Sequence, residues 1–97
     1  MDQKLKYSII LFYSNINQIS LKTRVMINKF ISTQHYPVRI TIKEVDYDQD
    51  KNLSQQYGIM GTPAIVFLKN GGVYRRHFGE LTSEELKIIL DSIFLIN

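Results

Sequence analysis

Ser20 is the residue of this sequence that comes nearest to a catalytic nucleophile, because it stands at the start of a predicted helix. A serine becomes nucleophilic when a neighbouring base takes its proton. The two histidines, His35 and His77, are not placed by the sequence pattern to act as that base, and we expect both at the surface. The chain has no cysteine, which excludes disulfides, thiolate catalysis and thiolate metal sites. We therefore predict no catalytic residue and a protein that is not an enzyme.

Alternating acidic residues between positions 45 and 50, in the run VDYDQD, resemble the first part of a calcium-binding loop. Such a loop also needs a central glycine and a distal glutamate at fixed spacing, and both are missing. The run fits the end of a strand, followed by an aspartate that caps a short helix over residues 51–57. We predict no metal site and no cofactor.

The stretch over residues 57–78, YGIMGTPAIVFLKNGGVYRRHF, contains the clearest local signals. Asn70-Gly71 lies between two apolar runs, and a type I′ turn needs the two positive φ angles that Asn and Gly adopt at low cost. Pro63 has no amide hydrogen, so it suits the first residue of a strand. The pattern predicts a β-hairpin whose first strand starts at about Ala64.

Further elements on both sides of this hairpin must position the residues described above. Residues 7–13 form an apolar run typical of a strand buried on both faces. Residues 17–33 have helical spacing and residues 38–43 alternate with period two, which predicts a βαβ unit with parallel strands. A last helix begins with the capping box at residues 82–85. The face of that helix predicted to pack in the core consists of Leu86, Ile89, Leu90 and Ile93.

The helix over residues 17–33 has one predicted apolar face and one polar face. Its first turn can be capped by Asn15, Asn17 or Ser20. The predicted apolar stripe consists of Leu21, Val25, Phe30 and Ile31, and the residues predicted to face solvent are Lys22, Arg24 and Lys29.

Length and composition predict a single domain over residues 1–97. Of the 97 residues, 44% are hydrophobic and 22% charged, as in an ordinary globular protein. The longest apolar run is far shorter than the ~20 residues of a membrane helix, so we expect a cytoplasmic protein with no membrane partner. A net charge of +3 without an aromatic-basic motif argues against nucleic-acid binding.

The order and spacing of residues around the hairpin resemble those of thioredoxins. The residues that carry the resemblance are Tyr57, Gly58, Ile59, Pro63, Lys69, Asn70, Gly71 and Val73, and the similarity extends over about residues 7–93. The resemblance implies an α/β domain with a minimal thioredoxin-like fold, β-α-β-α-β-β-α. In that fold three helices flank a four-stranded mixed sheet with the order 2-1-3-4, whose last strand is antiparallel.

The residues that carry out the chemistry of thioredoxins are absent from this chain. The family's Cys-Gly-Pro-Cys motif falls on residues 17–20, its buried carboxylate falls on Leu11, and the lysine partner of that carboxylate falls on Glu44. The resemblance therefore implies a redox-inactive member in which Leu11 is an ordinary buried residue. In thioredoxins the proline that matches Pro63 follows a cis bond, and the residue before it pairs through its backbone with an extended peptide. We predict a cis Thr62-Pro63 bond.

A protein-interaction module without thiol chemistry is the leading interpretation. Its partner, an unidentified protein or extended peptide, is predicted to bind in a groove made by Ile16, Asn17, Gln18, Ile19, Ser20, Thr62, Pro63, Phe78 and Gly79. One alternative is a member of the thiol-disulfide oxidoreductase family by descent only. Another is a regulatory binding protein similar to the thioredoxin-related clock protein KaiB. That second resemblance is weaker and rests on length, on Phe12-Tyr13, on the serine at the helix start and on Thr62-Pro63.

The strand over residues 38–46 is predicted to be an open edge of the sheet, because the strand that lies beside it in full-length thioredoxins has no counterpart here. An open edge invites pairing with a second copy or with a partner strand. Arg39 and Lys43 are expected to limit indiscriminate pairing. We expect a homodimer through this edge.

Overall fold

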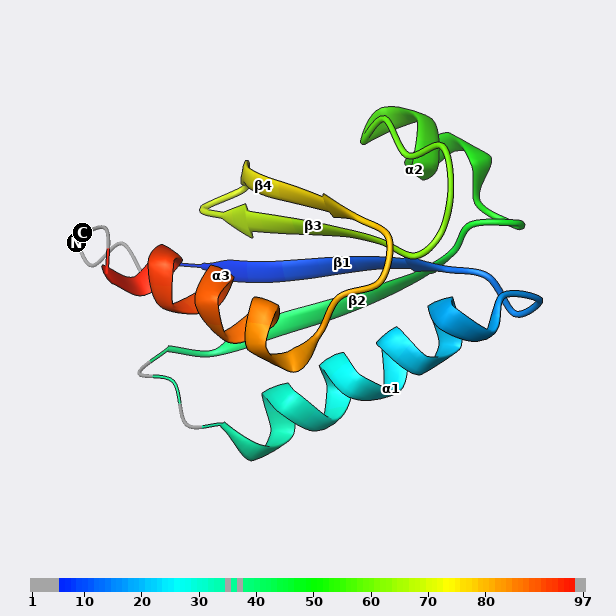
Figure 1. The fold of residues 1–97 in the computed structure, drawn as a ribbon. Coiled ribbons are helices and arrows are strands. Elements are labelled where there is room, and N and C mark those ends of the chain that lie inside the picture. The colour runs from blue at the N-terminus through cyan, green and yellow to red at the C-terminus, as the bar shows by residue number, and fades with distance from the viewer. Residues whose placement is uncertain (1–5, 35, 37, 96–97) are drawn as a thin grey trace.

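The computed structural model describes residues 6–34, 36 and 38–95 of the chain. Within these residues the elements follow the predicted order (Figure 1): β1 (Tyr7–Tyr13), α1 (Gln18–Thr33), β2 (Ile40–Asp46), α2 (Lys51–Gln56), β3 (Ala64–Lys69), β4 (Gly72–Phe78) and α3 (Ser83–Leu95). None of the helices in this part of the chain is long and apolar enough to cross a membrane.

The strands form one mixed sheet in the order β2-β1-β3-β4. β1 pairs in parallel with β2 and antiparallel with β3, and β4 pairs antiparallel with β3. The predicted strand order and the parallel βαβ unit are therefore confirmed. β2 begins at Ile40 and not at residue 38 as predicted, because the ladder with β1 starts where Tyr7 meets Ile40.

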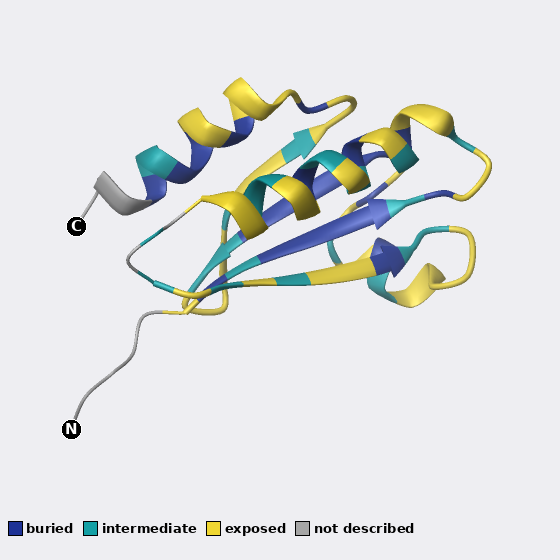
Figure 2. Cartoon of the chain, turned by 90° about the horizontal axis from the view of Figure 1, so that it is seen from below, coloured by how far each residue is buried: buried dark blue, intermediate teal, exposed yellow. Residues whose placement is uncertain are grey.

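Helices α1 and α3 lie on one face of the sheet, and the short helix α2 lies at one end of the other face (Figure 1). The larger core cluster joins the sheet to α1 and α3 and contains Leu11, which is fully buried as predicted. A smaller cluster around Phe12 and Ala64 lies on the α2 side. The predicted inner face of the last helix is buried at Leu86, Ile89, Leu90 and Ile93. Figure 2 shows the buried central strands and the exposed outer faces of the helices.

The apolar stripe predicted for helix α1 is only partly confirmed, because Phe30 and Ile31 pack against the core and Val25 does not. Thr23 and Ile27 are buried, and Phe30 and Ile31 pack against the same core cluster, at the i, i+4, i+7, i+8 spacing of one helix face. Val25, which was predicted to belong to the apolar stripe, is 66% exposed. Two residues, or about 200° of helical rotation, separate Val25 from Thr23, so the side chains point in opposite directions.

The predicted turn has the expected backbone angles, and the predicted start of α3 is fixed by hydrogen bonds. Asn70 and Gly71 have φ angles of 53° and 85°, as the type I′ turn requires. The capping box is closed by the amide of Glu85 bonding to Thr82 Oγ1 at 3.1 Å, and by the amide of Thr82 bonding to Glu85 Oε1 at 3.0 Å. Helix α2 ends at Gln56, one residue earlier than predicted.

Candidate functional site

The start of α1, the loop before β3 and the end of β4 meet at one end of the sheet. The side-chain amide of Asn17 donates a hydrogen bond to the carbonyl oxygen of Thr62 at 3.4 Å. The backbone amide of Gly79 donates to the carbonyl oxygen of Pro63 at 2.9 Å. The Thr62–Pro63 peptide bond is cis. The fold thus joins three predicted site segments that are far apart in the sequence.

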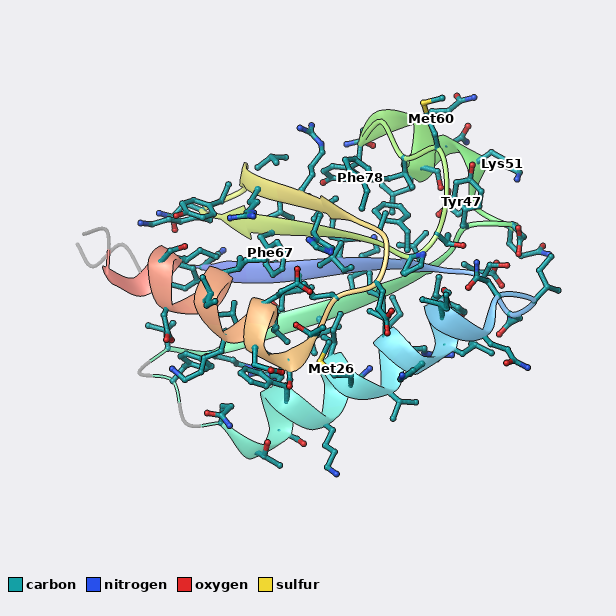
Figure 3. All side chains as sticks on the ribbon, viewed as in Figure 1. Met26, Tyr47, Lys51, Met60, Phe67 and Phe78 are labelled. Atoms are coloured by element: carbon teal, nitrogen blue, oxygen red, sulfur yellow. The ribbon has the colours of Figure 1, made fainter. Side chains whose placement is uncertain are left out.

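An apolar groove of about 420 Å³ opens beside this junction, and we call it the Pro63 groove. It is lined by Gly58, Met60, Gly61, Thr62, Pro63, Phe78 and Gly79. Met60 is 90% exposed and Phe78 is 57% exposed, so two large apolar side chains meet solvent at its rim. Figure 3 shows both residues at the end of the molecule that holds α2. Clustered exposed apolar surface of this kind is typical of a binding site.

The start of α1 and the residue before its N-cap add further apolar surface on the other side of the junction. Ile16 is 90% exposed, and Ile19, three residues later, is also exposed. Asn17 caps the helix, because its Oδ1 atom accepts a hydrogen bond from the amide of Ser20 at 2.9 Å. Gln18 is exposed beside them. The structure therefore places the predicted α1 residues, with the exception of Ser20, at or near the surface of the site.

The prediction that Ser20 belongs to the binding surface is wrong, because Ser20 is fully buried. Its Oγ atom accepts a hydrogen bond from the backbone amide of Ser14 at 2.8 Å, which ties the helix to the end of β1. His77, expected at the surface, is only partly exposed, and its Nε2 atom lies 2.9 Å from the carbonyl oxygen of Glu80. The prediction for His35 lies outside the described residues.

Sequence reasoning missed Met60 as a groove residue. Met60 lies in the loop between α2 and β3, in the run Gly58-Ile59-Met60-Gly61. Ile59 is buried in the smaller core cluster, whereas Met60 points away from it. The available signal was a large apolar residue next to glycine in a loop, where neither a helix face nor a strand face can bury it.

Glu44, which the resemblance to thioredoxins placed at the family's lysine position, belongs to a hydrogen-bonded cluster on the surface of α1 and β2. Arg24 Nε donates to Glu44 Oε2 at 2.8 Å, and Arg24 Nη2 donates to Glu44 Oε1 at 3.0 Å. These bonds lower the pKa of Glu44 below its ordinary value, although partial burial acts to raise it; a further hydrogen bond from Asn28 also lowers it. Arg24 Cζ also lies 4.4 Å from the ring centroid of Tyr13, so Arg24 does not simply face solvent as predicted. The cluster holds α1 against the sheet.

The acidic loop after β2 is tied to neighbouring polar side chains. Ser14 Oγ donates to Asp48 Oδ2 at 2.7 Å, and Asn15 Nδ2 donates to Asp46 Oδ2 at 3.2 Å. Asp50 Oδ1 accepts from the amide of Leu53 at 3.0 Å and caps α2, as predicted. In the described part of the chain, no three His, Asp or Glu side chains are grouped so that they could hold a metal ion.

Comparison with known proteins gives one family and several similar structures. The thioredoxin family model matches residues 6–92. Among solved structures, thioredoxin-2, a component of the malaria parasite protein secretion machinery, is 21% identical with a TM-score of 0.81, over 94% of this chain and 86% of that protein. A malarial protein is 21% identical with a TM-score of 0.79, over 90% and 96%. A mutant thioredoxin from Halobacterium salinarum NRC-1 is 17% identical with a TM-score of 0.80, over 90% and 74%.

Proposed function

This chain belongs to the thioredoxin family, and we propose that it acts by binding a protein partner and not by thiol chemistry. The proposed ligand is an extended segment with large apolar side chains that occupies the Pro63 groove. The observation that carries the proposal is the exposure of Met60 and Phe78 at the rim of that groove. The other lining residues are glycines, a threonine and a proline, which leave the backbone accessible.

The backbone beside the groove suits an extended ligand. In the described part of the chain, the amide of Thr62 has no hydrogen-bond acceptor. Its carbonyl oxygen accepts a bond of 3.4 Å from Asn17, longer than the ~2.9 Å typical of such bonds. An extended peptide can supply both a carbonyl oxygen and an amide to this residue, as in other complexes formed by addition of a strand.

The side chains around the groove favour apolar groups on the ligand. Ile16 and Met60 are each 90% exposed in the free protein, so a partner that covers them removes apolar surface from water. This removal contributes about 25 cal/mol for each Å² of apolar surface. Methionine also adapts its shape to different partners, because its side chain is unbranched and polarizable. The proposed partner is therefore a segment rich in aliphatic or aromatic residues.

The resemblance to thioredoxins places the family's two thiols at Asn17 and Ser20, and both of these residues have structural roles. Thiol-disulfide exchange requires a thiolate that attacks a disulfide sulfur, and this chain has no cysteine. Asn17 caps α1, and Ser20 is buried with its Oγ bound to the amide of Ser14. We expect the pure protein to reduce a protein disulfide no faster than buffer in a turbidity assay. Measurable turnover would contradict this part of the proposal.

The binding proposal is tested with a displayed library of random linear peptides. Peptides selected on the protein are synthesised, and their Kd is measured by fluorescence anisotropy on the parent and on a Met60→Ser, Phe78→Ser double variant. Ile88→Ser is the matched control, because Ile88 is exposed and lies on α3, away from the groove.

We expect apolar consensus peptides whose Kd rises at least about tenfold on the double variant, which corresponds to ~1.4 kcal/mol. The control variant should bind like the parent. Selected peptides that are mainly charged, or binding that the groove variant leaves unchanged, would contradict the proposal.

A further inference from the structure

β2 forms an edge of the sheet. In the described part of the chain it pairs only with β1, through the ladder from Ile40 to Asp46. The described loop hydrogen bonds outside that ladder reach only its last residue, Asp46. The outer backbone groups of β2 therefore have no strand beside them among these residues, and such a row of groups is a template for pairing with another chain.

The opposite edge of the sheet, β4, has features that discourage pairing. Arg75 and Arg76 are exposed on neighbouring positions of β4, and the register with β3 shifts between Phe67 and Leu68. Charged side chains and irregular register both make an edge strand a poor template. β2 instead keeps one register with β1 through all seven of its residues. β2 also has two exposed charged residues, but Lys43 and Glu44 are opposite in sign, whereas Arg75 and Arg76 are both positive. The two edges are thus unequal, and β2 is the one more suited to pairing.

We propose that β2 pairs antiparallel with β2 of a second copy of this chain and joins the two sheets into one. A two-fold axis perpendicular to the joined sheet relates the two copies. This axis keeps each face of the sheet on the same side in both copies. Because side chains alternate between the two faces, residues opposite each other must point to the same face. The axis therefore passes beside a residue, and not between two residues.

The sequence of β2 complements itself when the axis passes beside Ile42. In that register Ile42 lies opposite its own copy, Thr41 lies opposite Lys43, and Ile40 lies opposite Glu44. No like charges face each other across the pairing. Cross-strand apolar pairs such as the one at Ile42 stabilise an antiparallel ladder.

The neighbouring registers each place like charges opposite each other. An axis beside Lys43 puts this residue against its own copy, and an axis beside Glu44 does the same for the glutamate. An axis beside Thr41 puts Arg39 opposite Lys43. Like charges directly opposite in a ladder are destabilising. Charge thus excludes the registers centred on Thr41, Lys43 and Glu44. A register centred on Ile40 has no like charges opposite each other, but it leaves Ile40 as the only β2 residue opposite β2 of the other copy, whereas the register centred on Ile42 pairs residues 40–44. The register centred on Ile42 is therefore favoured, and a second copy is a suitable occupant of this edge.

The outer surface of α1 adds an apolar contact beside this edge. Val25 is 66% exposed. With Leu21 and Glu44 it lines a hollow of about 460 Å³ between α1 and β2. Ile40 and Ile42 pack toward the same side of the sheet. Two copies of α1 would therefore approach each other beside the paired strands and cover Val25. In this arrangement Val25, whose exposure the helix pattern did not predict, would be covered by the second copy and removed from water.

The proposal is tested by sedimentation equilibrium on the full chain, from micromolar to near-millimolar concentration. Thr41→Lys places a lysine opposite Lys43 in both halves of the dimer. Thr41 is exposed, but its Oγ1 atom donates to the carbonyl oxygen of Tyr7 at 3.2 Å, a bond that every variant with Thr41→Lys loses equally. Adding Lys43→Glu to that variant restores opposite charges across the axis. Val73→Lys, at an exposed position of β4, is the matched control. Circular dichroism verifies the fold of each variant.

We expect the parent to dimerise, and Thr41→Lys to raise the dimer Kd about fivefold or more. The Thr41→Lys, Lys43→Glu variant should recover the parent Kd, and the control should leave it unchanged. A parent that is monomeric at every concentration would overturn the proposal. So would a dimer that responds to Val73→Lys, or one that Thr41→Lys leaves unchanged, because its interface would then lie elsewhere.

Discussion

Replacing Leu11 with aspartate tests how the central strand excludes charge. Leu11 is fully buried on β1, where it lies between Glu44 of β2 and Ile65 of β3 in the sheet register. A carboxyl group here must either ionise without water or stay protonated. Arg24, a nearby cation, is already bound to Glu44. We therefore expect the pKa of the new carboxyl group to rise far above that of an exposed aspartate.

The expected loss of stability has two parts. Loss of the buried leucine side chain costs about 2–5 kcal/mol, as in other substitutions that empty a core. Keeping the carboxyl group protonated at pH 7 costs up to ~4 kcal/mol, because an unfolded aspartate with a pKa near ~3.9 would be ionised. The sum is comparable to the whole stability of a typical domain, about 5–15 kcal/mol. The Leu11→Asp variant should be largely unfolded at pH 7.

Circular dichroism without urea measures the folded fraction between about pH 4 and pH 7, and urea unfolding at the lower pH values, where the variant is more stable, measures the free energy of unfolding. With a raised folded-state pKa, the folded protein holds a proton that the unfolded chain loses, so stability falls as the pH rises from ~3.9 to that pKa and then levels off. Leu11→Asn, which has a similar shape but does not titrate, is the control. A constant difference between the two variants across this pH range would refute the reasoning. Leu11→Asp as stable as the parent at pH 7 would show that the strand is misplaced.

The remaining predictions concern α1. Thr23 Oγ1 is buried without a hydrogen-bond partner among the described residues, so Thr23→Val should raise the free energy of unfolding by about 1 kcal/mol; an equal decrease would mean that the hydroxyl has a partner. Arg24 lowers the pKa of Glu44 in the folded protein. The pair therefore stabilises the fold fully at pH values above the pKa of Glu44 in the unfolded chain, and this contribution is lost as the pH falls through the lowered pKa of the folded state. Arg24→Gln should raise the pKa of Glu44 in an NMR titration and cost less than about 1 kcal/mol at neutral pH, since both side chains are partly exposed. Asn17→Ala should cost about 1 kcal/mol in urea unfolding through loss of the helix cap, whereas Asn17→Asp should cost little.

The secondary structure was predictable because its signals are local. Asn70-Gly71 adopts the positive φ angles that its residue types favour, and Asp50 caps α2 with its own side chain. The apolar run of β1 correctly predicted that the strand is buried on both faces. The spacing of residues around the hairpin was sufficient to recognise the thioredoxin family and, through it, the order of the strands.

The candidate site was only partly predictable. Thr62, Pro63 and Phe78 were proposed from the resemblance to thioredoxins, and the structure brings them together at the Pro63 groove. Ser20 was included wrongly, because the direction of a side chain in the first turn of a helix depends on how the helix sits against β1. Met60 was missed, because exposure of a loop residue depends on which neighbours cover it. The cytoplasmic location and the absence of nucleic-acid binding stay predictions.

The sequence by itself determined the elements, their order and the absence of cysteine, since these follow from residue types and from spacings within a few turns or strands. Only the tertiary structure decided which face of α1 is buried, which left Val25 exposed beside β2 and Thr23 inside. Several residues of that helix have similar hydrophobicity, so its periodicity allows more than one inner face. The choice among them depends on the summed packing against β1, α3 and the Arg24–Glu44 pair, and contacts between distant segments exist only once the chain is folded.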